Sequence, residues 1–173
     1  MHRGYPVTVT LAGDEQSGKT AFCKTALGLE PDRFHRATLD ETYECEVAVQ
    51  GRPYLVKLLD TSGNYEYRGM IEYDVKTSDG VLLFMHNEFR ASFVSLDEYV
   101  DCIRAALTEI DIPIILVGNV RAGSADRIPR DQVDAFCAKH GCTYAEVDCL
   151  HDREAALEVL RQMVARAKRL KLN

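Results

Sequence analysis

The stretch GDEQSGKT, residues 13–20, matches the pattern G-x-x-x-x-G-K-[ST] at every specified position. A β-rich run precedes it at residues 5–12, and a run compatible with a helix follows it at residues 21–27. In this context backbone N–H groups curl around a phosphate, the helix N-terminus adds its positive dipole, and Lys19 adds a full charge. Thr20 offers its hydroxyl to a Mg²⁺ ion. These flanks favour a phosphate-binding P-loop over a glycine-rich turn that matches the pattern by chance.

The length and composition of the chain are typical of one globular domain. Its 173 residues are 46% apolar and 28% charged, and the formal net charge of −6 argues against a general attraction to nucleic acid. No apolar run approaches the length of a membrane span, and no signal-peptide core follows the N-terminus. We expect a single domain over residues 1–173, located in the cytoplasm, without a transmembrane segment.

The six cysteines are spread through apolar segments and include no C-x-x-C pair, which is typical of reduced thiols in a cytosolic protein. One region contains residue types that bind zinc: Cys137, His140, Cys142, Cys149 and His151. Their spacing matches no recurrent zinc pattern, and the first two end an apparent helix that stops at Gly141. We therefore expect core thiols here and not a zinc site.

Apolar strand-like segments alternate with helical patterns along the chain. The predicted strands are residues 5–12, 42–49, 54–59, 80–85, 112–117 and 143–147, and a last helix is predicted over residues 152–170. The turn from Gln50 to Pro53 joins the second and third strands into an antiparallel hairpin. The later strands are separated by helical patterns and need crossover connections. This order predicts a mostly parallel sheet that is buried on both faces.

A second motif, DTSG, occupies residues 60–63 at the end of the third predicted strand. In P-loop NTPases a carboxylate at this strand end holds the Mg²⁺ shell, and a nearby glycine N–H meets the γ-phosphate. On its own, D-x-x-G more often marks a simple turn. Because it follows one hairpin after a P-loop, it predicts that Asp60 and Gly63 belong to the phosphate site.

These motifs resemble those of a Ras-type small GTPase of the P-loop GTPase superfamily, and the resemblance extends from Val7 to Arg169 without a gap. Residues 60–63 are similar to the family's DTAG motif, and residues 117–119 to the start of its base-recognition segment. The resemblance implies the P-loop GTPase fold: an α/β structure with a six-stranded, mostly parallel sheet, one antiparallel edge strand, and helices on both faces. It also implies Mg²⁺-dependent binding of GTP and GDP, and GTP hydrolysis that toggles two switch loops in signal transduction.

The same resemblance assigns roles to individual residues. It places the Mg²⁺ ligands at Thr20, Thr38 and Asp60, and the catalytic residues at Lys19 and Asn64. The residues expected to contact the nucleotide are Glu15, Gln16, Ser17, Gly18, Lys19, Thr20, Ala21, Thr38, Gly63, Asn119 and Cys149.

Effector or regulatory proteins are expected to bind an apolar switch surface. The partner contacts are expected at Leu39, Tyr43, Tyr65, Tyr67 and Met70, and the neighbouring Ile71 and Tyr73 are expected to complete the same apolar surface. The alternative is that half of these side chains only cap the sheet.

The basic end of the last helix, residues 166–171, is expected to complement the helix dipole. Membrane anchoring is not supported, because no C-a-a-X box follows; either the protein is unlipidated or this chain is a domain of a longer one.

The chain departs from the family pattern where the base is read. In place of Asn-Lys-x-Asp it has Asn119 followed by Val120, Arg121 and Ala122, so the carboxylate that grips the guanine edge and the lysine that packs over the base are both missing. In place of Ser-Ala-Lys it has DCL at residues 148–150, and Pro31 stands where the family often has an aromatic ring. We expect weakened guanine specificity.

The catalytic positions differ as well. Asn64 replaces the glutamine that orients the attacking water and is one methylene shorter. Glu15 and Gln16 occupy positions that are often glycine in Ras proteins. The carboxylate of Glu15 repels polyphosphate unless it turns to solvent, and its bulk obstructs an arginine finger. We expect slow or impaired GTP hydrolysis.

Two other interpretations stay open. A pseudo-GTPase, a non-enzymatic binding module with a fixed switch surface, is favoured by the missing base and catalytic residues and opposed by the complete magnesium site. A small P-loop nucleoside or nucleotide kinase is less favoured; in it, Arg121, Arg127 and Arg130 would form a phosphate-gripping lid. The nucleotide that co-purifies with the protein would distinguish these functions.

Overall fold

The computed structural model describes residues 6–30, 39–64, 66, 68–107, 111–121, 123–124 and 127–171, without the side chains of residues 168–171. The strands in this part of the chain are β1 (Val7–Ala12), β2 (Asp40–Val49), β3 (Arg52–Thr61), β4 (Gly80–His86), β5 (Ile114–Asn119) and β6 (Thr143–Val147). The helices are α1 (Lys19–Leu27), α2 (Arg68–Thr77), α3 (Arg90–Val94), α4 (Leu96–Ala106), α5 (Arg130–His140) and α6 (Arg153–Lys171).

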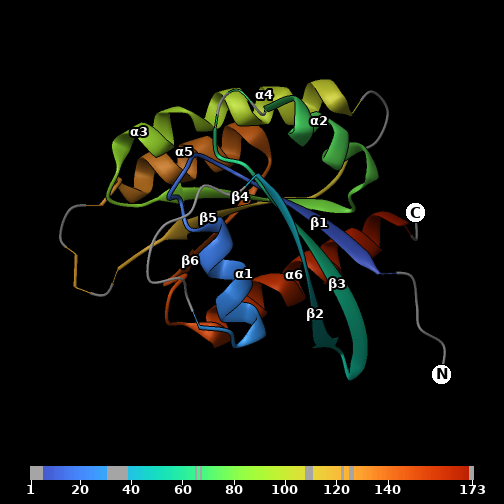
Figure 1. Cartoon of the computed structure of the whole chain (residues 1–173). Coiled ribbons are helices and arrows are strands. Elements are labelled where there is room, and N and C mark those ends of the chain that lie inside the picture. Colours follow the sequence, from blue (N-terminus) through green and yellow to red (C-terminus); the bar gives the residue numbers. More distant parts are fainter. Residues whose placement is uncertain are drawn as a thin grey trace.

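The strands form one sheet in the order β2-β3-β1-β4-β5-β6 (Figure 1). β2 pairs with β3 in antiparallel fashion and lies at one edge, whereas every other pair of neighbours is parallel. The hairpin and the parallel crossovers are therefore confirmed. Because β1, β3, β4, β5 and β6 run in the same direction, the loops that follow them leave the sheet at a single edge.

The turn between β2 and β3 is tighter than the sequence predicts. Gln50 and Gly51 both have positive φ, 51° and 75°, and they alone separate the two strands. A two-residue turn of this kind matches the twist of the strands that it joins. Pro53, predicted to lie in the turn, is instead part of β3, before the pairing of β3 with β1 begins at Val56. A strand tolerates a residue without an N–H at such a position.

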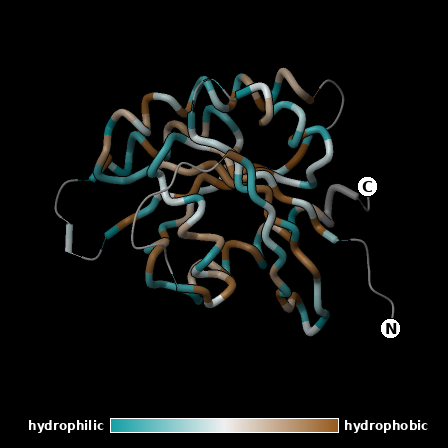
Figure 2. The backbone as a smooth tube through the Cα atoms, in the orientation of Figure 1, coloured by the Kyte–Doolittle hydropathy of each residue, from teal (hydrophilic) through white to brown (hydrophobic). Residues whose placement is uncertain are grey.

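Helices cover both faces of the sheet, with α1 and α6 on one face and α2, α3, α4 and α5 on the other (Figure 1). Figure 2 shows that hydrophobic backbone positions concentrate in the sheet, between the two layers of helices. One buried apolar cluster, on the α1 and α6 face, includes Val9, Phe22 and Leu160. The other, on the opposite face, includes Leu83 and Phe136.

Successive side chains of β1 point to opposite faces of the sheet, and the two faces differ in polarity at this strand. Val7, Val9 and Leu11 belong to the apolar cluster beneath α1 and α6. Thr10 is also fully buried, and its Oγ1 lies 2.7 Å from Oγ of Ser78, directly after α2. α2 therefore packs on a more polar part of the sheet than α1 and α6 do.

Two helices end at glycines, as the sequence indicates. α1 and α5 are followed by Gly28 and Gly141, whose φ values of 72° and 65° lie in the left-handed region that closes a helix.

The six cysteines, all among the described residues, are free thiols; Cys102 and Cys137 are half-buried and the others are buried. Within the described residues, no group of three or more His, Cys, Asp or Glu side chains is placed to hold a metal ion. No helix in this part of the chain has both the length and the apolar character needed to cross a membrane.

Asp74 is a buried carboxylate on α2. Only 8% of the residue is exposed, and its Oδ2 has no hydrogen-bond partner among the described residues. Burial, reinforced by the Asp40 carboxylate and opposed by Lys57, raises the pKa of Asp74 to about 6. Because burial destabilises the ionised form, this carboxylate weakens the packing of α2 at neutral pH.

Asp74→Asn is therefore expected to raise Tm at about pH 7.5 and to leave it nearly unchanged at about pH 4. The folded-state pKa lies above the unfolded value, so the folded wild type takes up a proton, and gains stability, as the pH falls through about 6. Calorimetric melting across this range measures the effect, with Asp101→Asn on the exposed side of α4 as the matched control. An equal gain at both pH values would contradict the role of ionisation.

Candidate functional site

The P-loop connects the end of β1 to the start of α1. Gly18 caps α1 with a φ of 109°, which favours glycine, and Gln16 also has a positive φ, 60°. Glu15 and Gln16 are exposed, whereas Ser17 is buried and its Oγ has no hydrogen-bond partner among the described residues. Ala21 lies half-buried in the first turn of α1. The N-terminus of α1 thus directly follows the loop, as phosphate binding requires.

The side chain of Lys19 spans the loop to which it belongs. Its Nζ donates to the carbonyl oxygens of Gly13 at 2.7 Å and Asp14 at 2.9 Å, and only 5% of the residue is exposed. Burial lowers the pKa of Lys19 to about 8, and the Asp60 carboxylate is the largest opposing influence. A buried ammonium group is stabilised strongly by a nearby anion. Lys19 is therefore well placed to bind phosphate.

Thr20 and Asp60 meet between the start of α1 and the end of β3. Thr20 Oγ1 donates to Asp60 Oδ2 at 2.6 Å, and Asp60 is fully buried. Its second oxygen, Oδ1, has no hydrogen-bond partner among the described residues. Burial raises the pKa of Asp60 to about 6, although the Thr20 hydroxyl and Lys19 act in the opposite direction. A buried carboxylate oxygen beside a hydroxyl fits Mg²⁺, which prefers hard oxygen ligands.

The ends of β5 and β6 pack against the P-loop. A Cβ added to Gly18 would lie 2.6 Å from Asn119 Nδ2 and 3.2 Å from Cys149 Sγ. Asn119 Oδ1 in turn accepts a hydrogen bond from the backbone N of Cys149 at 3.3 Å. The fold thus brings together three residues that the sequence assigned to nucleotide binding.

Gly63 also contacts the P-loop. A Cβ added to Gly63 would lie 2.3 Å from the backbone N of Glu15 and 2.5 Å from the carbonyl carbon of Asp14, so this approach requires a glycine. The following residue, Asn64, uses its side chain in a local turn, where its Oδ1 accepts a hydrogen bond from the N of Glu66 at 3.0 Å. The carboxamide expected to orient water is therefore bonded to its own backbone segment.

Some predicted positions lie outside the described residues. They are Thr38, expected at Mg²⁺, and Tyr65 and Tyr67 of the switch surface, together with Pro31 and Ala122 of the base site. Their roles stay predictions.

The described part of the switch surface is largely exposed. Leu39 is 63% exposed and Met70 is 38% exposed, and the neighbouring Tyr73 is 73% exposed. Tyr43 differs from them, because it packs half-buried against the apolar cluster of the α1 and α6 face and its hydroxyl donates to Glu41.

Ile71 was predicted to form part of the apolar switch surface, and that prediction is wrong. The residue is fully buried in the apolar cluster of the opposite face. Ile71 and Val75 are four residues apart on α2, so both point from the same side of the helix toward the sheet.

Two of the three arginines considered for a kinase lid, Arg127 and Arg130, form other ion pairs. Arg127 lies 3.4 Å from Glu146, and Arg130 lies 2.8 Å from Asp134. These contacts hold both side chains against α5 and β6.

One group of contacts was missed by the sequence motifs. Asp14, at an unspecified position of the P-loop pattern, accepts hydrogen bonds from Ser95 Oγ at 2.7 Å and from Tyr99 Oη at 3.1 Å. These donors are 81 and 85 positions away in the chain, so no local pattern indicates the contacts.

A protein-family model described as the Ras family matches residues 8–169. The match covers nearly the whole chain, so this protein belongs to the Ras family, and its sheet and loops are those of the P-loop GTPase fold. Family membership identifies the site as that of a small GTPase-like, nucleotide-binding protein.

Among curated proteins, the chain is similar to a Ras and EF-hand domain-containing protein of Xenopus tropicalis, with 33% identity over 112 residues. The matched region is 64% of this chain and 15% of that relative. The chain thus spans a small part of the length of this relative.

Gly63→Ala is expected to destabilise the fold, because the new Cβ would enter the backbone of Glu15. Overpacking of this kind costs about 1–3 kcal/mol. Gly69→Ala is the matched control, since a Cβ on Gly69, in the first turn of α2, meets nothing within 4 Å. Urea unfolding at equilibrium measures both variants. Equal stability of the two variants would show that Gly63 is not held against the P-loop.

Proposed function

We propose that the protein is a Ras-like molecular switch that binds GTP and GDP with Mg²⁺, hydrolyses GTP slowly, and selects guanine weakly. The observation that carries this proposal is the convergence of Lys19, Thr20 and Asp60 at the P-loop. Together they supply the positive charge, the hydroxyl and the carboxylate that a Mg²⁺-nucleotide site requires.

In the proposed switch, Lys19 binds the outer phosphates, and Thr20, Thr38 and Asp60 hold Mg²⁺ or its water shell. The ion, when bound, neutralises charge on the phosphates and helps to orient them. Residues 15–18 and Ala21 surround the phosphates, and the N–H of Gly63 meets the γ-phosphate. Two observations support these roles: the pKa of the buried Lys19 is lowered, and Oδ1 of the buried Asp60 has no hydrogen-bond partner within the part of the chain that the structure describes. An anion beside Lys19 and a cation beside Asp60 would stabilise both charged groups.

Slow hydrolysis is supported by two side chains. Asn64 is bonded to the turn that it begins and is too short to reach as far as a glutamine. Glu15 is exposed at the outer side of the P-loop, where its bulk stands in the path of an arginine finger from an activating protein. Both features favour a long-lived triphosphate complex.

Weak guanine selection is supported by the backbone at the end of β6. The N–H of Cys149 donates to Asn119 Oδ1, and the N–H groups of Leu150 and His151 both donate to Asp148 Oδ1. These three donors are already paired, and the family's base-reading lysine and aspartate are replaced by Val120 and Ala122. In the proposed complex, the phosphates therefore contribute most of the binding energy.

The proposed partners are effector or regulatory proteins that bind the switch surface. Its exposed described members, Leu39 and Met70, with Tyr73 beside them, offer apolar contact area next to the acidic edge strand β2. The chain is proposed to act as one domain in the cytoplasm, which the six free thiols support.

A pseudo-GTPase is the second candidate, favoured by the turn-bound side chain of Asn64 and the altered base site. Mass spectrometry of the nucleotide that co-purifies with the protein separates the candidates. GTP or GDP supports the switch, the absence of any nucleotide supports the binding module, and phosphorylation of an added nucleoside monophosphate would indicate a kinase.

Lys19→Ala is expected to lower the affinity for Mg²⁺-GDP by about one to two powers of ten, through loss of a charge-assisted contact. Wild-type affinity should also fall as the pH rises through about 8, because a neutral Lys19 must take up a proton before it can pair with phosphate. Titration calorimetry at several pH values measures both effects, with Lys24→Ala on the same helix as the control. Equal binding by wild type and Lys19→Ala would show that the loop is only structural.

The double variant Glu15→Gly, Asn64→Gln is expected to hydrolyse GTP faster than wild type under single-turnover conditions. It restores the side chain that reaches the water and removes the carboxylate beside the polyphosphate. Phosphate release after mixing with Mg²⁺ measures the rate. Wild-type turnover as fast as that of the double variant would mean that another residue orients the water.

Val120→Lys combined with Ala122→Asp is expected to raise selectivity for GDP over ADP. The new carboxylate would accept two N–H bonds from guanine, where adenine presents an acceptor, a contact worth about 1.5–3 kcal/mol. Competition binding of the two nucleotides measures this. Asp126→Ala is the companion variant, because Asp126 is the nearby carboxylate that a folded-back loop would use. If Asp126→Ala abolishes a strong guanine preference of the wild type, the loop already reads the base and the expectation is wrong.

A further inference from the structure

The carboxylate of Asp14 connects the P-loop to α4. Its Oδ2 accepts a hydrogen bond from Ser95 Oγ at 2.7 Å, and its Oδ1 accepts one from Tyr99 Oη at 3.1 Å. Ser95 is the residue between α3 and α4, and its backbone is itself helical, with an N–H that donates to the carbonyl oxygen of Ala91 at 3.2 Å. Because two hydroxyls donate to its carboxylate, Asp14 is tolerated in a loop that must accept phosphate.

The backbone of Asp14 takes part in the phosphate site itself. Its carbonyl oxygen accepts hydrogen bonds from Lys19 Nζ at 2.9 Å and from the N of Ser17 at 3.3 Å. Its carbonyl carbon is also one of the atoms against which Gly63 packs. A displacement of the Asp14 side chain would therefore move atoms that position Lys19 and Gly63.

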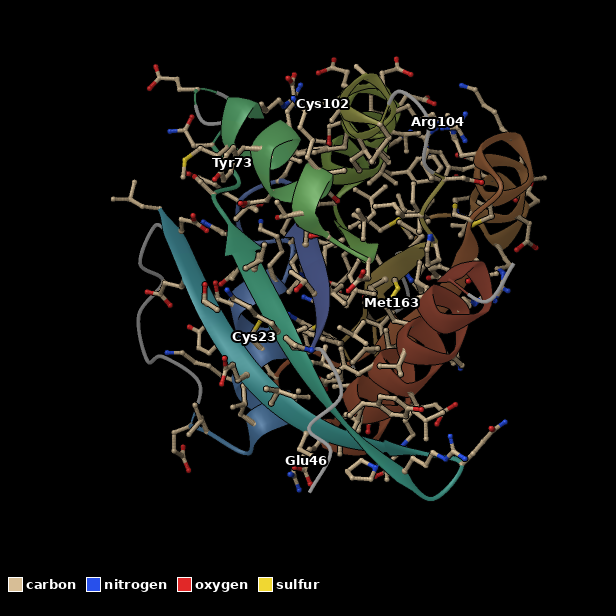
Figure 3. The ribbon with its side chains drawn as sticks, turned by 90° about the vertical axis from the view of Figure 1, so that its right-hand side faces the viewer. Cys23, Glu46, Tyr73, Cys102, Arg104 and Met163 are labelled. Carbon is tan, nitrogen blue, oxygen red and sulfur yellow. The ribbon has the colours of Figure 1, made fainter. Side chains whose placement is uncertain are left out.

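Tyr99 connects the same contact to α2. The tyrosine is 1% exposed, and the guanidinium carbon of Arg68 lies 4.6 Å from its ring centroid. Arg68 is the first residue of α2, and it also pairs with Glu98 of α4 at 2.6 Å. Figure 3 shows α2 and α4 together at the top of the view, where Cys102 of α4 lies within 3.9 Å of the carbonyl oxygen of Arg68.

Tyr99 thus contacts two neighbours at once. Its hydroxyl donates to Asp14 of the P-loop, and the guanidinium of Arg68, at the start of α2, acts on both the hydroxyl and the ring. Burial and the Asp14 carboxylate raise the pKa of Tyr99, so the hydroxyl remains a donor at physiological pH. The ring is packed in the apolar cluster, which leaves it little freedom to follow one neighbour without affecting the other.

We propose that Asp14 and Tyr99 are positioning residues, which couple the P-loop to the start of α2 so that a displacement of Arg68 changes how firmly the nucleotide is held. This inference rests on the proposed function and adds a route by which a protein bound at α2 controls nucleotide release. The coupling is reciprocal, so a nucleotide that fixes the P-loop also favours the observed position of Arg68.

Release of a fluorescent N-methylanthraniloyl-GDP, with Mg²⁺ present, tests the coupling. Tyr99→Phe keeps the ring under Arg68 and removes only the hydroxyl. It is expected to accelerate release roughly three- to tenfold, because only part of the energy of a charge-assisted hydrogen bond, about one to two powers of ten, is transmitted to the nucleotide. Asp14→Ala is expected to act similarly, and the double variant no more than either single one. Asp14→Asn keeps an acceptor and should restore slow release.

The control for this measurement is Tyr144→Phe, whose hydroxyl contacts Asn87 and Glu146 instead. It should leave release unchanged. If the effects of Asp14→Ala and Tyr99→Phe multiply, or if Asn fails to restore slow release, the two residues do not act as one unit and the proposal is overturned.

A second measurement needs no nucleotide and so separates failure of this inference from failure of the proposed function. In the nucleotide-free protein, Arg68→Gln should increase hydrogen exchange of the amides of residues 15–18 at least severalfold if the P-loop follows α2. Arg161→Gln, which removes two ion pairs on α6, is the control and should not change those amides. Unchanged exchange in Arg68→Gln would overturn the coupling even if the protein binds GDP tightly.

Discussion

The pairing of β1 with β3 determines where every part of the phosphate site lies. In this parallel pair Leu11 lies opposite Asp60, and Thr61 Oγ1 donates to the carbonyl oxygen of Leu11 at 2.6 Å. The P-loop and the DTSG motif therefore leave the sheet side by side, although more than thirty residues and an antiparallel strand separate them in the chain. A one-residue slip in register would turn Asp60 to the opposite face of the sheet and remove it from Thr20.

Much of this arrangement follows from short-range sequence signals. The P-loop glycines, the apolar strands and the stop at Gly141 each have a local physical cause. The structure confirms the sheet, and the element boundaries in its described part fall within two residues of those predicted. The predictions were weaker where tertiary contacts determine the position of a side chain. Ile71 was misplaced because a short amphipathic helix does not reveal, without its partner sheet, which apolar residues face inward. The contacts of Asp14 were missed because their donors come from a distant helix, and positions left open in a motif carry no expectation about their side chains.

The two halves of the proposed nucleotide site differ from the pattern expected of the family to different extents. The phosphate half combines an intact motif with buried groups whose protonation is poised near neutrality, about 8 for the pKa of Lys19 and about 6 for that of Asp60. The base half keeps Asn119, but here it ties the P-loop to the end of β6. Asn119 thus has a structural function that is independent of guanine, which explains how it can be present while its neighbours Val120 and Ala122 differ from the family pattern.

The two faces of the sheet are also held by different forces. α6 covers the sheet with fully buried apolar residues such as Leu160 and Met163. The buried side of α2 instead carries Asp74, whose Oδ2 has no hydrogen-bond partner among the described residues, beside the apolar Ile71 and Val75, and the hydroxyl pair of Thr10 and Ser78 follows the helix. Lifting α2 away would expose Ile71 and Val75 but would also hydrate polar groups that favour water, while lifting α6 would expose mainly hydrocarbon. We therefore expect α2 to detach at a lower free energy than α6, which leaves the sheet folded under α6.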